Sequence, residues 1–179
     1  MKKIFVLLAG LLFTNCAENP QQKEVSIQQT AQLIHLKTTT LDTHNDINVK
    51  NFTDSLNYSQ NTDTQVNLPK MQAGALDVSW FIVYTNQGDL TPQGYKKAAD
   101  NAQSKFDAIR RLTEIYAPTK IGLATSSAEV DSLRKMSKKV AMIGVENAYP
   151  IGLDTASVKR YYDMGARYMS LAHNGHNQF

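Results

Sequence analysis

The sequence has a single cysteine, little excess charge and no long apolar run. One cysteine, Cys16, cannot form an internal disulfide, so the fold must be held by its core. The longest apolar stretch at the start, residues 4–13, is half of the roughly 20 residues needed to cross a bilayer. The net charge is only +3, of which Lys2 and Lys3 supply two, so the basic surface expected of a nucleic-acid-binding protein is missing.

The first 15 residues have the pattern of an export signal: a basic start, a short apolar core and then polar residues. Cys16 follows directly, where bacterial lipoproteins carry their lipid. We therefore predict an export signal over 1–15, lipid attachment at Cys16, a polar tether over 16–36 and a membrane-anchored lipoprotein of the bacterial envelope. The residues just before Cys16 are larger than usual. A simple cleaved signal, giving a periplasmic or secreted protein, is the alternative.

Beyond the tether, candidate strands and helices alternate along the chain. Apolar or β-branched runs at 38–41, 76–85, 140–145 and 167–172 indicate buried strands, and helical periodicity or caps indicate helices at 92–116, 127–138 and 154–164. This alternation predicts an α/β fold with a parallel sheet, either an open doubly wound sheet or a (β/α)₈ barrel. About four strands are present, whereas a complete barrel takes about 250 residues, so a barrel would be partial.

Metal-capable side chains stand at the ends of three predicted strands. His44 and Asp46 are two residues apart, a spacing that places both on one face of an extended segment. Glu146 directly follows the run at 140–145, and His173 directly follows 167–172. Each alone is unremarkable, because histidines and carboxylates are common in loops and turns. Together they predict a metal site at the carboxyl ends of the strands, where barrel enzymes build their active sites.

Four ordered segments carry a resemblance to a known family. They read LDTHND at 41–46, VNLPKM at 66–71, GVEN at 144–147 and GARYMSLAHN at 165–174. From about residue 38 to the last residue, the chain resembles the membrane (renal) dipeptidases. That resemblance implies a (β/α)₈ barrel of the metal-dependent hydrolase kind with two Zn²⁺ ions, of which residues 37–179 would form the N-terminal half. It also implies hydrolysis of a dipeptide substrate to free amino acids.

The resemblance also implies roles for individual residues. His44 and Asp46 match the pair that binds the first zinc, Glu146 the carboxylate that bridges both ions, and His173 the histidine that polarises the scissile carbonyl. Asp42 and Asn45 are expected to shape the strand end. The family's other ligands come from later strands and have no counterpart here, so we expect this chain alone to be inactive. The alternatives are another metal-dependent amidohydrolase, or a non-catalytic peptide-binding lipoprotein, on the same barrel.

Overall fold

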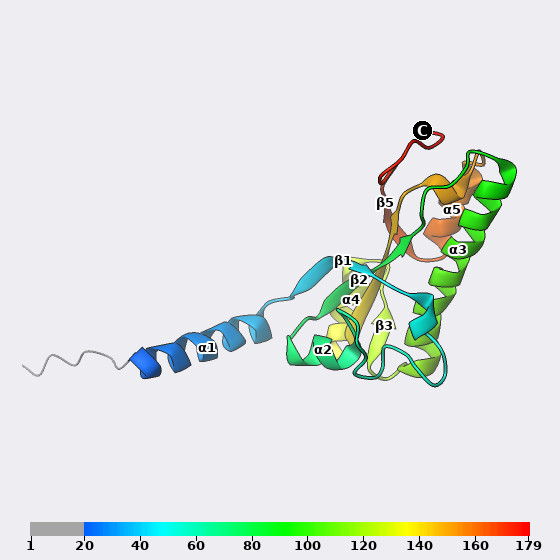
Figure 1. Ribbon diagram of the computed structural model, residues 1–179. Coiled ribbons are helices and arrows are strands. Elements are labelled where there is room, and N and C mark those ends of the chain that lie inside the picture. Colours follow the sequence, from blue (N-terminus) through cyan, green and yellow to red (C-terminus); the bar gives the residue numbers. More distant parts are fainter. Residues whose placement is uncertain (1–19) are drawn as a thin grey trace, which may run out of the picture. The chain divides into compact units, whose positions relative to one another are not determined.

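The computed structural model describes residues 20–179, so the predicted export signal and Cys16 lie outside the described residues. The chain divides after residue 37 into two units. The described part of the first unit is one helix, α1 (Pro20–Lys37), and the second unit contains the sheet (Figure 1). In the described part of the chain, none of the helices is both long and apolar enough to span a membrane.

Helix α1 occupies a segment for which the sequence predicted no regular structure. Its glutamines, lysines, alanine and leucines favour helix, but its apolar side chains are exposed and form no buried stripe, as Val25 and Leu36 illustrate. The prediction relied on periodic burial and therefore missed a helix that rests on propensity.

The second unit is built around a parallel five-stranded sheet. Its strands are β1 (Leu41–Asp46), β2 (Val78–Tyr84), β3 (Ile121–Leu123), β4 (Lys139–Glu146) and β5 (Ala166–Met169). Strands β1, β2, β4 and β5 lie side by side in chain order. A doubly wound sheet reverses its strand order at a switch point, and this order does not reverse. The arrangement is therefore that of a partial (β/α)₈ barrel, as predicted.

Strand β3 is an addition that the sequence did not reveal, because three residues are too few for a periodic signal. It pairs with residues 139–141 of β4. Strand β5 pairs with residues 143–145 on the same edge of β4, because β2 occupies the other edge.

The helices of this unit are α2 (Leu68–Ala73), α3 (Pro92–Arg111), α4 (Ser127–Lys135) and α5 (Ala156–Asp163). Helix α2 was not predicted. The helix predicted over 92–116 ends as an α-helix at Arg111 and continues as a π-turn over Leu112–Tyr116. Ser126 caps α4 by accepting a hydrogen bond from the Glu129 amide.

The core lies between the sheet and α3. Strand β4 is buried from Val140 to Val145, so both of its faces are covered. Ala102, Phe106 and Ile109 of α3 are fully buried and belong to the same core cluster as Phe81 and Val83 of β2. This packing fixes the strands relative to one another, and with them the side chains at their carboxyl ends.

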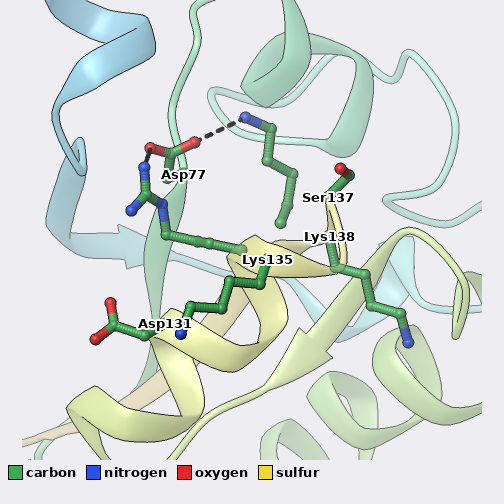
Figure 2. A pocket seen from close by; sticks show the side chains of 7 residues that line it. Asp77, Asp131, Lys135, Ser137 and Lys138 are labelled. Carbon is green, nitrogen blue, oxygen red and sulfur yellow. Dashed lines mark hydrogen bonds and ion pairs between the residues drawn. The ribbon is translucent and has the colours of Figure 1, made fainter.

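Ion pairs link β2, β4 and α4 at the amino ends of the two strands. Asp77, just before β2, forms ion pairs with Arg134 of α4 at 3.2 Å and with Lys139 of β4 at 3.3 Å (Figure 2). These groups line a cavity of about 360 Å³ together with Asp131, Lys135, Ser137 and Lys138. The cavity is thus at the end of the sheet opposite the predicted metal residues.

Candidate metal centre

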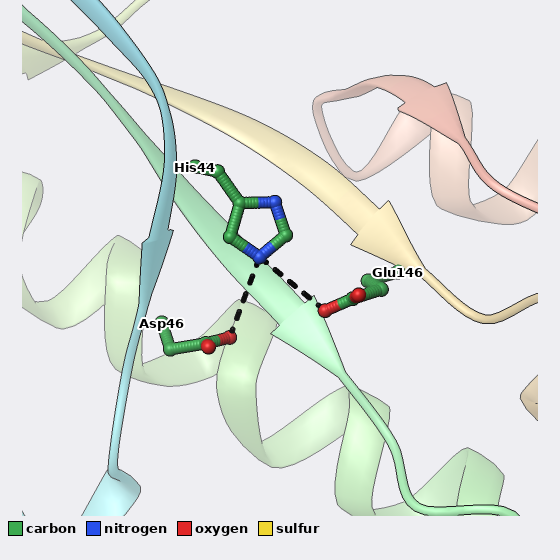
Figure 3. Close-up of side chains that lie close together, drawn as sticks. All are labelled: His44, Asp46 and Glu146. Atoms are coloured by element: carbon green, nitrogen blue, oxygen red, sulfur yellow. Dashed lines mark ion pairs between the residues drawn. The ribbon is translucent and has the colours of Figure 1, made fainter. Parts of the chain in front are cut away.

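Glu146, the last residue of β4, is the centre of the candidate site. Its Oε2 lies 3.3 Å from Nε2 of His44 on β1, and its Oε1 lies 3.3 Å from Nε2 of His173, beyond β5. Asp46 Oδ1 lies 3.9 Å from the same nitrogen of His44. Figure 3 shows the imidazole of His44 directed at both carboxylates. The structure therefore brings together His44, Asp46, Glu146 and His173, the four residues that the sequence placed at one rim.

Strand β1 holds His44 in a β-bulge. Asp42 pairs with Ser79 and Asn45 with Phe81, so Thr43 and His44 together face the single residue Trp80. The backbone amide of His44 donates to Asp42 Oδ1 at 3.0 Å, and the side-chain Nδ2 of the buried Asn45 donates to Ser79 Oγ at 3.0 Å. Asp42 and Asn45 thus fix the local shape of the strand end.

Asn147 ties three rim loops together directly behind Glu146. It is fully buried and has a left-handed backbone with φ 73°. Its Nδ2 donates to the Thr85 carbonyl at 3.0 Å, its Oδ1 accepts from the Tyr149 amide at 3.2 Å, and its own amide donates to Ser170 Oγ at 2.9 Å. The loops after β2, β4 and β5 therefore share one residue, which fixes the point where Glu146 leaves its strand.

Two further residues near the site were not identified from the sequence. Burial lowers the pKa of Lys105, on α3, while the charges of Asp46 and Glu146 oppose that shift. Its Nζ lies 5.5 Å from the ring centre of Tyr84, and that ring lies 4.9 Å from the imidazole of His173 in an edge-on contact. In the sequence, Lys105 is only a lysine beside apolar residues of a predicted helix, a pattern too common to indicate a functional site.

The donor set fits a divalent metal ion. One ligand atom each from His44, Asp46 and Glu146 lies within 4.8 Å of the others. Two carboxylates and an imidazole supply hard oxygen and borderline nitrogen donors, the combination that zinc, manganese and similar ions accept. The two carboxylates would also leave excess negative charge at the rim unless a cation balanced it. Among the described residues, these three side chains are the group whose ligand atoms lie close enough together to hold one metal ion.

Comparison with known proteins gives a consistent result. A family model described as membrane dipeptidase, peptidase family M19, matches residues 28–179. The dipeptidase aclJ of Aspergillus oryzae is 26% identical over 121 residues, which cover 64% of this chain and 28% of that protein. The chain thus spans less than a third of that relative's length.

Solved structures share the fold. The probable dipeptidase PvdM of Pseudomonas aeruginosa matches 90% of this chain and 40% of its own, with a TM-score of 0.79 and 19% identity. A metallopeptidase of Rhodobacter sphaeroides, crystallised with a phosphinate mimic of the dipeptide L-Ala-D-Ala, matches 77% of this chain and 46% of its own, with a TM-score of 0.63 and 17% identity. The family model covers most of the described chain and the fold agrees with it, so the chain belongs to the membrane dipeptidase family, peptidase family M19.

Proposed function

We propose that the protein is a zinc-dependent dipeptidase that hydrolyses dipeptides to free amino acids. The observation that carries the proposal is the position of Glu146, whose two carboxylate oxygens face His44 on one side and His173 on the other. A carboxylate with one oxygen toward each of two neighbouring groups suits a bridging ligand. Membership of the M19 family supports the reaction, and the dipeptide mimic bound by the Rhodobacter relative supports the substrate class.

In this proposal His44, Asp46 and Glu146 hold the ion. A bound divalent ion supplies Lewis acidity, which lowers the pKa of water and polarises a carbonyl. Zinc is proposed over manganese because an imidazole is present beside the carboxylates. Two ions are proposed because the resemblance to the membrane dipeptidases implies a second one at Glu146.

His173 has a different role because it lies on the far side of Glu146 from His44. We assign it the donation of a hydrogen bond to the carbonyl oxygen of the substrate as negative charge develops there. The Glu146 carboxylate and the ring of Tyr84 both contact His173 and restrict its orientation. A fixed donor has less to reorganise in the transition state than a mobile one.

The test is hydrolysis of L-Ala-D-Ala and L-Ala-L-Ala by the protein expressed from its complete coding sequence, with the released alanine quantified. Activity should disappear on dialysis against a chelator and return with Zn²⁺. Glu146→Gln should lose both bound metal and turnover, because a neutral amide balances positive charge poorly. Glu114→Gln, at an exposed carboxylate paired with Arg110, is the matched control and should behave as wild type. Turnover that survives complete metal removal, or a fully active Glu146→Gln protein, would contradict the proposal.

A further inference from the structure

The strand that carries His44 and the strand that precedes His173 both contain an extra residue. On β1 the bulge places Thr43 and His44 opposite Trp80. On β5, Ala166 pairs with Ile143 and Tyr168 with the next residue, Gly144, so Arg167 is the additional residue. A bulge changes the direction in which the neighbouring side chains point. Here the second bulge sits immediately before Tyr168.

The side chain of Tyr168 reaches from β5 to β1. Its ring lies over Gly144 of β4, where a Cβ atom would overlap the ring, so this crossing requires glycine. The ring packs on Trp80 of β2 with centroids 5.1 Å apart and planes tilted by 33°. Its hydroxyl then donates to the carbonyl of Thr43 at 3.1 Å, a contact between residues 125 apart in sequence. This one side chain of β5 thus contacts β4, β2 and β1.

The hydrogen bond ends on the bulge itself. A bulge places backbone groups outside the regular ladder, where they need other partners. The carbonyl of Thr43 has the hydroxyl of Tyr168, and the amide of His44 has the carboxylate of Asp42. Burial raises the pKa of Tyr168, so the hydroxyl keeps its proton and remains a donor.

We propose that Tyr168 is a positioning residue for the metal centre: its hydroxyl holds the Thr43–His44 bulge and thereby aims the His44 imidazole at the ion. The inference rests on the proposed metal-binding role of His44, Asp46 and Glu146. Among these described residues, no hydrogen bond or ion pair joins Tyr168 to the three ligand side chains, so its effect on His44 is transmitted by the backbone of β1. A purely space-filling role would need only the ring, which phenylalanine also supplies. The hydroxyl therefore separates the two roles.

The first test compares the Tyr168→Phe protein with wild type. Zinc affinity is measured by competition with a chromophoric chelator, and the ligand geometry by the absorption spectrum of the Co²⁺-substituted protein. We expect Tyr168→Phe to bind zinc roughly 10–100-fold more weakly, the usual effect of removing a group that orients a ligand, and to shift the cobalt spectrum. The turnover number should fall while KM for the dipeptide stays within about twofold. Tyr162→Phe, at an exposed tyrosine of α5, should change none of these values.

A second test uses Gly144, because the ring can also be displaced without altering the tyrosine. Gly144→Ala should weaken zinc binding in the wild-type background and add no further loss in a Tyr168→Ala background, since no ring is then left to displace. Equal losses in both backgrounds, or a Tyr168→Phe protein with wild-type zinc affinity and cobalt spectrum, would overturn the inference. A wild-type protein that binds no zinc would instead overturn the proposed function.

Discussion

Replacing Asn147 should reveal how much the rim depends on one buried amide. Its side chain donates to Thr85 and accepts from Tyr149, and its backbone has φ 73°. Losing the side chain removes its hydrogen bonds to Thr85, Tyr149, Gln87 and Asn177. It leaves the buried Thr85 carbonyl and Tyr149 amide unpaired, at about 1–3 kcal/mol each. Asn147→Gly should therefore lower the free energy of unfolding by about 2–6 kcal/mol.

Asn147→Ala should cost more than Asn147→Gly, because alanine has a Cβ. The left-handed conformation costs a residue with a Cβ about 1–2 kcal/mol, and the greater flexibility of unfolded glycine offsets about 0.5–1 kcal/mol of that difference. Alanine should thus be less stable than glycine by about 0.5–1 kcal/mol, although elsewhere in a regular element it is the more stable of the two.

The measurement is urea-induced unfolding followed by far-UV circular dichroism and by the fluorescence of Trp80, the only tryptophan of the sequence. Asn101→Ala, at an exposed position of α3, is the control and should change stability by less than about 0.5 kcal/mol. If the alanine variant at position 147 equals or exceeds the glycine variant in stability, the left-handed backbone is not a constraint. If both are as stable as wild type, the buried amide does not join the loops.

Three further perturbations test separate parts of the chain. His173→Ala should keep its metal while turnover falls by about 10²–10³-fold through loss of a transition-state contact; His35→Ala, on the exposed α1, is the control, and metal loss in the His173 variant would make that residue a ligand instead. Lys105→Met should raise the urea midpoint at pH 7, because the lowered pKa of Lys105 means that its charged form is disfavoured in the fold. This gain in stability should shrink as the pH rises toward the ordinary lysine pKa of 10.5. A gain that grows with pH would contradict the direction of the pKa shift. We also propose a lipid on Cys16, so Cys16→Ser should release the protein from bacterial membranes, whereas mass spectrometry showing an unmodified Cys16 in the mature wild type would refute the anchor.

The positions of the candidate metal residues could be predicted because parallel strands end at a common rim. Glu146 and His173 each follow an apolar run directly, so finding the run locates the residue. The i,i+2 spacing of His44 and Asp46 also predicted correctly that both side chains lie on the same side of the strand, although that prediction did not include the bulge. The bulge at Thr43 shifts the register by one residue, and a shift of one residue has no periodic signature in sequence.

Other features could not be predicted because they depend on distant contacts. Lys105 belongs to a helix, and only the packing of α3 on β2 brings it near Tyr84. The left-handed conformation of Asn147 is fixed by Thr85, 62 residues earlier in the chain, and by Tyr149. Local propensity describes neither case, because each contact forms only once the sheet is assembled.

The pairing order of the sheet has a consequence for synthesis on the ribosome. Strand β2 can pair with β1 as soon as it emerges, because Leu41 and Val78 are only 37 positions apart, but its other edge waits for β4, since Val78 pairs with Val140. While the ribosome adds those 62 residues, the apolar strand Val78–Tyr84 presents an open edge to other chains. At about 5–20 residues per second, that interval lasts about 3–12 seconds. A nascent chain of this protein is therefore open to aggregation, and to binding by chaperones, along this edge between the emergence of β2 and that of β4.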